Sequence, residues 1–338
     1  MAVFFSIVIP VFNRPEEIRE LLSTFVLQSY KDPYEILIIE DGSTLPAKEV
    51  VEEFKDKIPV KYIFKENSGP GDSRNFGMAR AEGNYYILLD SDCLLPTNYL
   101  TEVANSLEIS YVDCFGGPDG AHPSFSNVQK AINYAMTSWL TTGGIRGHKR
   151  AVDQFQPRSF NMGLSKKAFE VSGGFGNIHP GEDPDLSLRL KEKGFNTRLI
   201  ASATVYHKRR IDFKKFFSQV KKFGKVRPIL NLWHPGSSKI TYWFPTIFCL
   251  GFIVSLVGLF LYKPLASILI IGYLLYFLLI FLDALRKDKS FLVALLAILA
   301  VIIQFWGYGM GFLKSIILTT FSNKQPQKLF PELFFESK

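Results

Sequence analysis

Cysteine is scarce in this sequence. The chain has only three cysteines, Cys93, Cys114 and Cys249, among its 338 residues. Three thiols cannot all pair, and their spacing matches no metal-binding motif, which excludes a disulfide scaffold and a cysteine-based zinc site. Such sparse use of cysteine fits a protein of a reducing compartment.

Several motifs that bind nucleotides or nucleic acids are also missing. The first predicted strand is followed by Asn13 and Arg14 rather than by Gly-x-Gly-x-x-Gly, which argues against a dehydrogenase-type dinucleotide fold. No Walker loop, internal repeat or low-complexity tract occurs in the chain. The net charge is +8, but no nucleic-acid-binding motif accompanies it, so we expect no nucleic-acid partner.

Long apolar runs fill the second part of the chain. Each of three runs reaches the ~20 residues that a helix needs to cross a hydrocarbon core, and they lie at residues 242–262, 265–282 and 291–312. We therefore expect three transmembrane helices. The predicted parts are an N-terminal domain, a membrane domain and a tail, at residues 1–228, 229–321 and 322–338. Residues 314–321 either continue the third helix or lie along the membrane surface.

Positive charge flanks these runs. Basic residues crowd into 207–227, before the first run, and into 286–289, between the second and the third. Because positively charged loops face the cytoplasm, we expect a multi-pass protein of the inner (cytoplasmic) membrane with its N-terminal domain in the cytoplasm. Residues 211–225 have an amphipathic pattern, which predicts a helix that either lies on the membrane surface or packs on the N-terminal domain.

The N-terminal part has an α/β pattern. Residues 2–12 predict a buried first strand rather than a signal sequence. Predicted strands at 4–9, 35–40, 60–64 and 85–90 alternate with predicted helices at 15–28, 46–55, 72–80 and 96–108. This alternation predicts a parallel sheet with helices on both faces, which binds ligands at the carboxyl ends of its strands. Polar residues follow the strands there, at 13–14, 40–43 and 90–92.

Two aspartates, Asp90 and Asp92, close the fourth predicted strand. Carboxylates one residue apart need a counter-charge, and hard cations share oxygen ligands with phosphates, so the pair indicates a nucleotide diphosphate held through a metal. The alternative is a cap for the helix that begins at Pro96. Similarly, residues 69–75 predict either a glycine-rich phosphate cradle or a turn with a helix cap.

Five segments in chain order resemble the family 2 glycosyltransferases of the GT-A fold. They are residues 8–14, 40–43, 69–75, 90–92 and 181–183. The resemblance covers roughly residues 3 to 228 and identifies 1–228 as the catalytic domain. It implies a Rossmann-like, mostly parallel α/β sheet with helices on both faces, followed here by C-terminal transmembrane helices.

The resemblance also implies roles for individual residues. A nucleotide-sugar site is implied for Pro10, Phe12, Asn13, Arg14, Glu40, Asp41, Ser43, Gly69, Arg74, Asp90, Ser91, Asp92, Glu182, Arg209 and Arg210. Asp92 is implied as a direct ligand of Mn²⁺ or Mg²⁺, with Asp90 nearer the ribose or the sugar. His207 resembles a third metal ligand, and the alternative is that His207 has only a structural role. A membrane-facing patch is the alternative for Arg209 and Arg210.

Asp183 resembles the catalytic base of an inverting transfer, in which a carboxylate takes the proton of the acceptor hydroxyl. The alternative is that Asp183, with Glu182 and Asp185, caps a helix predicted at 184–193, a role compatible with catalysis. We expect the positive end of that helix to lower the pKa of Asp183 and keep it ionised.

The implied reaction moves a sugar from a nucleotide diphosphate sugar, with a UDP-sugar favoured, to a hydroxyl of a lipid-linked saccharide or polysaccharide precursor at the membrane. A polyprenyl-phosphate sugar synthase, a processive polysaccharide synthase and a catalytically silent nucleotide-sugar-binding partner are the alternatives. Residues 219–223 only loosely resemble the Gln-x-x-Arg-Trp motif of processive synthases, because both final residues differ. This departure argues against a processive role.

Overall fold

The computed structural model describes residues 3–120, 125–143, 156–207 and 212–335. The chain divides into two compact units. The first contains residues 1–122, 145–208 and 334–338, and the second contains residues 123–144 and 209–333. Helix α5 and residues 213–228 of α9, which lie before the predicted boundary after residue 228, belong to the second unit.

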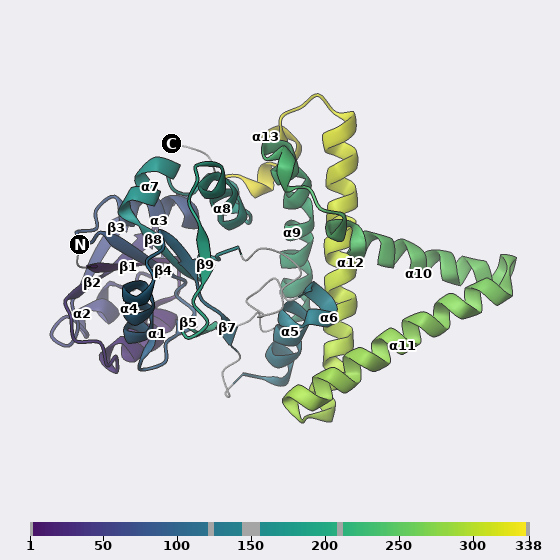
Figure 1. The fold of residues 1–338 in the computed structure, drawn as a ribbon, viewed down its shortest axis with the longest axis horizontal. Helices are drawn as coiled ribbons and strands as arrows, with labels where there is room; N and C mark the ends of the chain where they lie inside the picture. The colour runs from purple at the N-terminus through teal and green to yellow at the C-terminus, as the bar shows by residue number, and fades with distance from the viewer. Residues whose placement is uncertain (1–2, 121–124, 144–155, 208–211, 336–338) are drawn as a thin grey trace. The chain divides into compact units, whose positions relative to one another are not determined.

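The first unit is built on a seven-stranded sheet (Figure 1). In spatial order its strands are β3 (Val60–Lys65), β2 (Tyr34–Asp41), β1 (Phe5–Val11), β4 (Tyr85–Leu89), β8 (Asn161–Ser165), β6 (Cys114–Gly116) and β9 (Thr197–Leu199). The first four strands of that order run parallel, whereas β8 is antiparallel to both β4 and β6. The predicted α/β class and the mostly parallel sheet are therefore confirmed.

Apolar side chains cover both faces of this sheet. On one face, Phe5 and Ile7 of β1 pack in a core with Ile18 of α1 (Pro15–Val26). On the other face, Val8 packs in a core with Met78 of α3 (Pro70–Met78) and Leu186 of α8 (Glu182–Glu192). A strand buried on both sides reads as a continuous apolar run, which explains why 2–12 resembles a signal sequence. The remaining sheet-side helices are α2 (Lys48–Glu52), α4 (Tyr99–Ile109) and α7 (Lys166–Ser172).

A small second sheet joins distant parts of the first unit. Its strands are β5 (Cys93–Leu94), β10 (Val205–His207) and β7 (Asp119–Gly120), with β10 in the middle. The backbone of His207 pairs with that of Cys93, the residue after Asp92. The sequence did not indicate this sheet, because strands of two or three residues carry no periodic signal.

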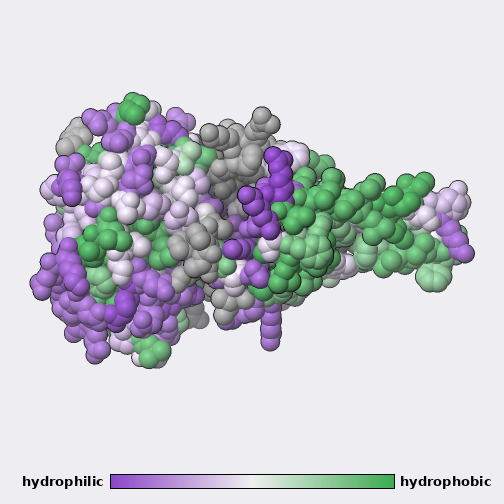
Figure 2. Space-filling view, turned by 90° about the horizontal axis from the view of Figure 1, so that it is seen from below, coloured by the Kyte–Doolittle hydropathy of each residue, from purple (hydrophilic) through white to green (hydrophobic). Residues whose placement is uncertain are grey.

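The second unit is helical. It contains α5 (Asn127–Thr137), α6 (Trp139–Thr142), α9 (Phe213–Trp233), α10 (Phe244–Leu261), α11 (Lys263–Asp288), α12 (Phe291–Phe321) and α13 (Pro326–Leu329). Three helical stretches are long and apolar enough to cross a membrane: Ile240–Leu261, Lys263–Asp288 and Phe291–Phe321. Figure 2 shows hydrophobic surface along the α10–α11 hairpin. The third apolar run continues as one helix to Phe321, which selects the first of the two predicted alternatives for 314–321.

Glycines allow α9 to approach α12 closely. A Cβ atom at Gly311 of α12 would collide with the carbonyl oxygen of Lys221, and one at Gly224 of α9 would collide with that of Tyr308. Small residues permit such backbone approach between helices in a membrane protein. The helix predicted at 211–225 therefore packs on α12, and its location at the membrane surface stays a prediction.

Candidate functional site

The candidate site lies where β4 ends and where α3 and α8 begin. β4 ends at Leu89, so Asp90 is the first residue beyond the sheet. Its Oδ1 accepts a hydrogen bond from Nη2 of Arg74 at 2.5 Å. Arg74 lies in the second turn of α3. The first residue of α3 is Pro70, and proline suits this position because the first N–H groups of a helix have no partner within the helix.

Arg74 is the centre of this cluster. Its side chain is 4% exposed, and its Nη1 lies 3.7 Å from Oε1 of Glu182, the first residue of α8. The Arg74 guanidinium also faces the ring of Phe175, 5.4 Å from its centroid. Burial disfavours the positive charge, but the charges of Asp90, Asp183 and Glu182 raise the pKa of Arg74. The buried Arg74 thus links the carboxylates of Asp90 and Glu182, which lie 92 positions apart in the sequence.

Asp183 is partly exposed, but its carboxylate oxygen Oδ1 is enclosed and has no hydrogen-bond partner among the described residues. Burial, and next the adjacent charge of Glu182, raise the pKa of Asp183 to about 6, against the opposing effects of Arg74 and Arg158. The expectation that the helix N-terminus lowers this pKa was therefore wrong. Desolvation of the carboxylate outweighs the helix dipole, which contributes only a modest stabilisation of negative charge.

Glu182, the residue before Asp183 in α8, lies in a different environment. It is 5% exposed, and its Oε1 lies 2.9 Å from Nδ1 of His179. Burial opposes its ionisation, but the His179 ring and Arg74 lower the pKa of Glu182. Two adjacent carboxylates in one enclosed site resist double ionisation, so neighbouring cations favour the charge on Glu182 and leave Asp183 easier to protonate.

Asp92 lies in a second cluster with residues from the start of α1. Its Oδ2 accepts a hydrogen bond from Nη1 of Arg14 at 3.2 Å. The same Arg14 nitrogen donates to Oε2 of Glu17 at 2.8 Å, and the hydroxyl of Ser91 also donates to Glu17. The structure thus brings Arg14, Ser91 and Asp92 together around Glu17, and their role in donor binding stays a prediction. Asp90 and Asp92 are one residue apart, so the two clusters adjoin.

Residues at the ends of β1 and β2 form hydrogen bonds that stabilise the loops after these strands. The backbone of Asn13 has a positive φ of 56°, and its Oδ1 accepts hydrogen bonds from the amides of Thr44 and Leu45. Its own N–H donates to the hydroxyl of Ser43. The carboxylate of Glu40 accepts hydrogen bonds from the hydroxyls of Ser43 and Tyr62 and the amide of Ala47. Pro10 lies within β1, and Phe12 is 48% exposed.

Asp41 organises the loop before α3. Its carboxylate is buried and accepts hydrogen bonds from Nζ of Lys65 at 3.0 Å and from the amides of Ser68 and Gly69 at 2.9 and 3.0 Å. The turn at Gly69 has a φ of +95°, a conformation that favours glycine. The amide of Gly69, the first residue of the predicted phosphate cradle, is thus bonded to a carboxylate of the chain itself. Gly69 forms the turn before α3, which has no side-chain cap, so the choice between a phosphate cradle and a turn with a cap stays open.

Three predicted residues fall partly or wholly outside the described structure. Arg209 and Arg210 lie outside it, and for His207 only the backbone position in β10 is described. Among the described residues, no group of three or more histidine, cysteine, aspartate or glutamate side chains is placed to hold a metal. Metal ligation by Asp90, Asp92 and His207 stays a prediction.

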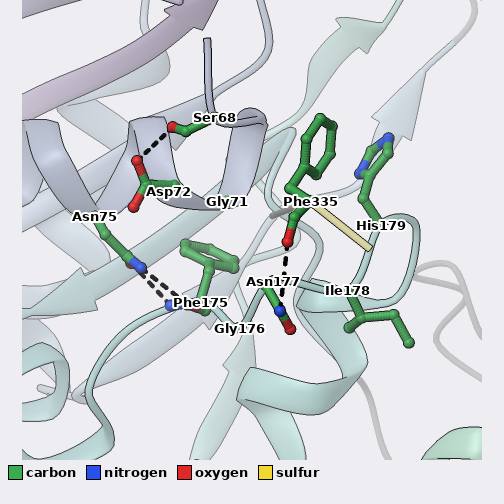
Figure 3. A pocket seen from close by; sticks show the side chains of 10 residues that line it. All are labelled: Ser68, Gly71, Asp72, Asn75, Phe175, Gly176, Asn177, Ile178, His179 and Phe335. Carbon is green, nitrogen blue, oxygen red and sulfur yellow. Dashed lines mark hydrogen bonds between the residues drawn. The ribbon is translucent and has the colours of Figure 1, made fainter. Parts of the chain in front are cut away.

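The sequence reasoning missed Glu17 and His179. Both stand three residues from a predicted site residue, Glu17 after Arg14 and His179 before Glu182, and both bond to it. That spacing was the only available signal. A pocket of about 180 Å³ opens beside His179 and was not predicted (Figure 3). Its lining includes Asp72 and Asn75 of α3, and Phe335 from near the end of the chain.

The chain is similar to glycosyltransferases over its N-terminal half. Residues 6–172 match the sequence model described as Glycosyl transferase family 2. A 112-residue segment is 30% identical to the poly(ribitol-phosphate) beta-N-acetylglucosaminyltransferase TarS of Staphylococcus aureus and covers 32% of this chain and 20% of that protein. A 141-residue segment is 30% identical to the glycosyltransferase AglE of Haloferax volcanii and covers 37% of this chain and 46% of that protein.

The matches span less than half the length of these two relatives. A solved structure that resembles the whole fold is the mannosyltransferase PcManGT of Pyrobaculum calidifontis, which was determined in complex with GDP-Man and Mn²⁺. It is 14% identical, with a TM-score of 0.53, and the likeness covers 95% of this chain and 88% of that one. At this identity the likeness shows the fold.

Proposed function

We propose, from the premise that residues 6–172 place the chain in glycosyl transferase family 2, that the protein is an inverting glycosyltransferase that uses a nucleotide diphosphate sugar. The observation that carries the proposal is the position of Arg74, which contacts Asp90 at one end and Glu182 at the other. Arg74 thus links Asp90, which is assigned to the donor, with Glu182, the chain neighbour of the proposed base Asp183, whose charge also raises the pKa of Arg74. We favour a UDP-sugar as the donor.

The donor side of the site combines cations with carboxylates. Arg14 and Arg74 can each form hydrogen bonds with phosphate oxygens, and a planar guanidinium can do so with two oxygens at once. In the structure both arginines are bonded to aspartates, Arg14 to Asp92 and Arg74 to Asp90. A diphosphate that enters with a bound cation could replace the aspartates as partner of the arginines, while the cation pairs with the aspartates. No charge would then be left buried without a partner.

Asp90 and Asp92 fit a Mg²⁺- or Mn²⁺-type ion. Such ions take hard oxygen ligands, and Mg²⁺ is commonly bound by one or two carboxylates together with substrate phosphates, so a third protein ligand is not required. We propose Asp92 as the ligand, with His207 as a candidate because its strand β10 pairs with β5 directly after Asp92. A bound ion would offset negative charge on the departing diphosphate.

Asp183 is proposed as the general base. Its carboxylate would take the proton of the acceptor hydroxyl while the hydroxyl oxygen forms a bond to the anomeric carbon and the bond to the diphosphate breaks. A single displacement inverts the configuration at that carbon. A pKa of about 6 leaves Asp183 ionised near pH 7 and yet basic enough to accept a proton in the transition state.

The long apolar helices support an acceptor at the membrane. Three helices with the length and composition of membrane spans follow the first unit in the chain. We propose that the catalytic domain lies in the cytoplasm and that the acceptor is a lipid-linked saccharide or a polysaccharide precursor in the adjoining leaflet. The name of the relative TarS, which describes a sugar transfer onto a polymer, is compatible with such an acceptor.

The test is a donor screen on the detergent-solubilised full chain. UDP-, GDP- and dTDP-sugars are incubated with Mn²⁺ and membrane lipid extract, with a chelator as the control, and the product is analysed by NMR for its anomeric configuration. The proposal predicts transfer from one class of donor, dependent on the metal and with inversion. No hydrolysis or transfer with any donor would favour the silent partner, and a product with retained configuration would contradict the mechanism.

A further inference from the structure

The last described residues of the chain return to the first unit. After the helices of the second unit, Phe334 forms a bridge with Ile178, and the N–H of Phe335 donates to the carbonyl of Asn177 at 3.0 Å. These contacts attach residues 334–335, here called the strap, to the segment that leads directly into Glu182 and Asp183. The strap belongs to the same compact unit as the candidate site.

The ring of Phe335 packs between two parts of the site. On one side it lies so close to Gly69 that a Cβ atom there would collide with it. On the other side its centroid is 5.9 Å from that of the His179 ring, with the two planes at 50° (Figure 3). Aromatic pairs at this separation attract each other and restrict each other's side-chain freedom.

His179 connects Phe335 with the carboxylates of the site. Its Nδ1 is 2.9 Å from Oε1 of Glu182, and that same oxygen is 3.7 Å from Nη1 of Arg74. Arg74 in turn holds Asp90. The contacts therefore run without a break from the strap to the end of β4, through side chains that are half-buried at His179 and fully buried at Glu182 and Arg74.

We propose that Phe335 is a positioning residue for sugar transfer, which acts by holding the His179 ring against Glu182. This inference rests on the proposed function and adds a residue that lies outside the matched family segment, 6–172. Without the Phe335 ring, His179 gains rotamers that release Glu182. Glu182 then competes with Asp90 for Arg74, and the base beside Glu182 loses its fixed surroundings.

The experiment is a double-mutant cycle on the full chain, with Phe335→Ala, His179→Ala and the double variant. Phe335→Leu, which keeps apolar contact with Gly69, serves if Phe335→Ala fails to fold, and Ile109→Ala, at a residue 87% exposed on α4, is the control. We expect each single variant to lower kcat about tenfold with little change in the donor KM, and the double variant to be no slower than either one.

Three outcomes would overturn the inference alone: a Phe335 variant as fast as the wild type, effects that multiply in the double variant, or a rise in donor KM at unchanged kcat. Multiplying effects with a lowered melting temperature would identify Phe335 as a purely structural residue. A wild-type protein that transfers no sugar would instead overturn the proposed function, and the inference with it.

Discussion

At the scale of single residues, the candidate site depends on the buried charge of Arg74. Its guanidinium contacts Asp90 and lies near Glu182, so both carboxylates would lose this counter-charge without it, and Glu182 would keep its contact with His179. The motif alone assigns Arg74 to the diphosphate or the sugar. It could not show that Arg74 also holds the protein's own carboxylates together, because that contact depends on the packing of α3 against α8.

Replacing Arg74 with alanine should destabilise the first unit. Removal of a buried charge from an ion-pair cluster costs about 3 kcal/mol or more, and here Glu182 stays buried with less opposing charge. Arg19→Ala, which removes an exposed ion pair with Glu53, should leave the melting temperature nearly unchanged, because exposed ion pairs contribute little to stability. Thermal unfolding of the two variants in detergent checks the difference, and equal melting temperatures would contradict the role given to Arg74.

Asp183 should set the acid limit of activity. A base must be ionised, so kcat/KM should be constant above about pH 7 and fall tenfold per pH unit below the Asp183 pKa of about 6. Stability should change in the opposite sense. Because burial raises the pKa of Asp183 in the folded state, its contribution to the unfolding free energy is fully present below the ordinary pKa of 3.8 and is lost as the pH rises through about 6.

A profile of kcat/KM from pH 5 to 9, measured with the donor well below its KM, tests this limit. A rate that stays constant down to pH 5 would remove Asp183 from the role of base. The direction of this shift could not be read from the sequence, which shows the helix start but not the enclosure of Oδ1.

At the scale of elements, the strands and helices with clear periodicity were predictable. The strands expected at 4–9, 35–40, 60–64 and 85–90 are found as β1 to β4, and the helix expected at 184–193 is α8. The short strands β5, β6, β7, β9 and β10 were missed, since two or three residues give no pattern. The neighbours of His207 and the strap were missed for the same reason, because only tertiary pairing defines them.

Helix α9 provides a test at this scale. Gly311→Ala would place a methyl group against the Lys221 carbonyl, whereas an alanine at Gly272 of α11 meets nothing within 4 Å. We expect Gly311→Ala to destabilise the second unit by about 1–3 kcal/mol, as overpacking does. Gly272→Ala should be neutral or slightly stabilising, because alanine favours helix. Melting temperatures in detergent compare the two, and an unaffected Gly311 variant would refute the close packing of α9 on α12.

At the scale of the whole molecule, the apolar helices predict a topology. If the basic loop at 286–289 faces the cytoplasm, the turn between α10 and α11 faces the other side of the membrane. Tyr262, 64% exposed in that turn, and Arg286, near the end of α11, are suitable positions for cysteine. The native Cys93, Cys114 and Cys249 are buried, so they give little background.

We expect a membrane-impermeant maleimide to label Tyr262→Cys on intact cells and Arg286→Cys only after the membrane is opened. The reverse pattern would place the catalytic domain outside the cytoplasm, where nucleotide sugars would have to be supplied. Equal labelling of both variants on intact cells would show that the α10–α11 hairpin does not cross the membrane.

The whole account requires that donor binding and proton removal be separate tasks of one site. The direct measurement compares donor binding and sugar transfer by Asp183→Asn with those of Asp185→Asn, whose carboxylate pairs with Arg189 instead. We predict that Asp183→Asn binds the donor about as well as the wild type and transfers sugar at least ~10²-fold more slowly, while Asp185→Asn transfers at nearly the wild-type rate. Normal transfer by Asp183→Asn would contradict the account.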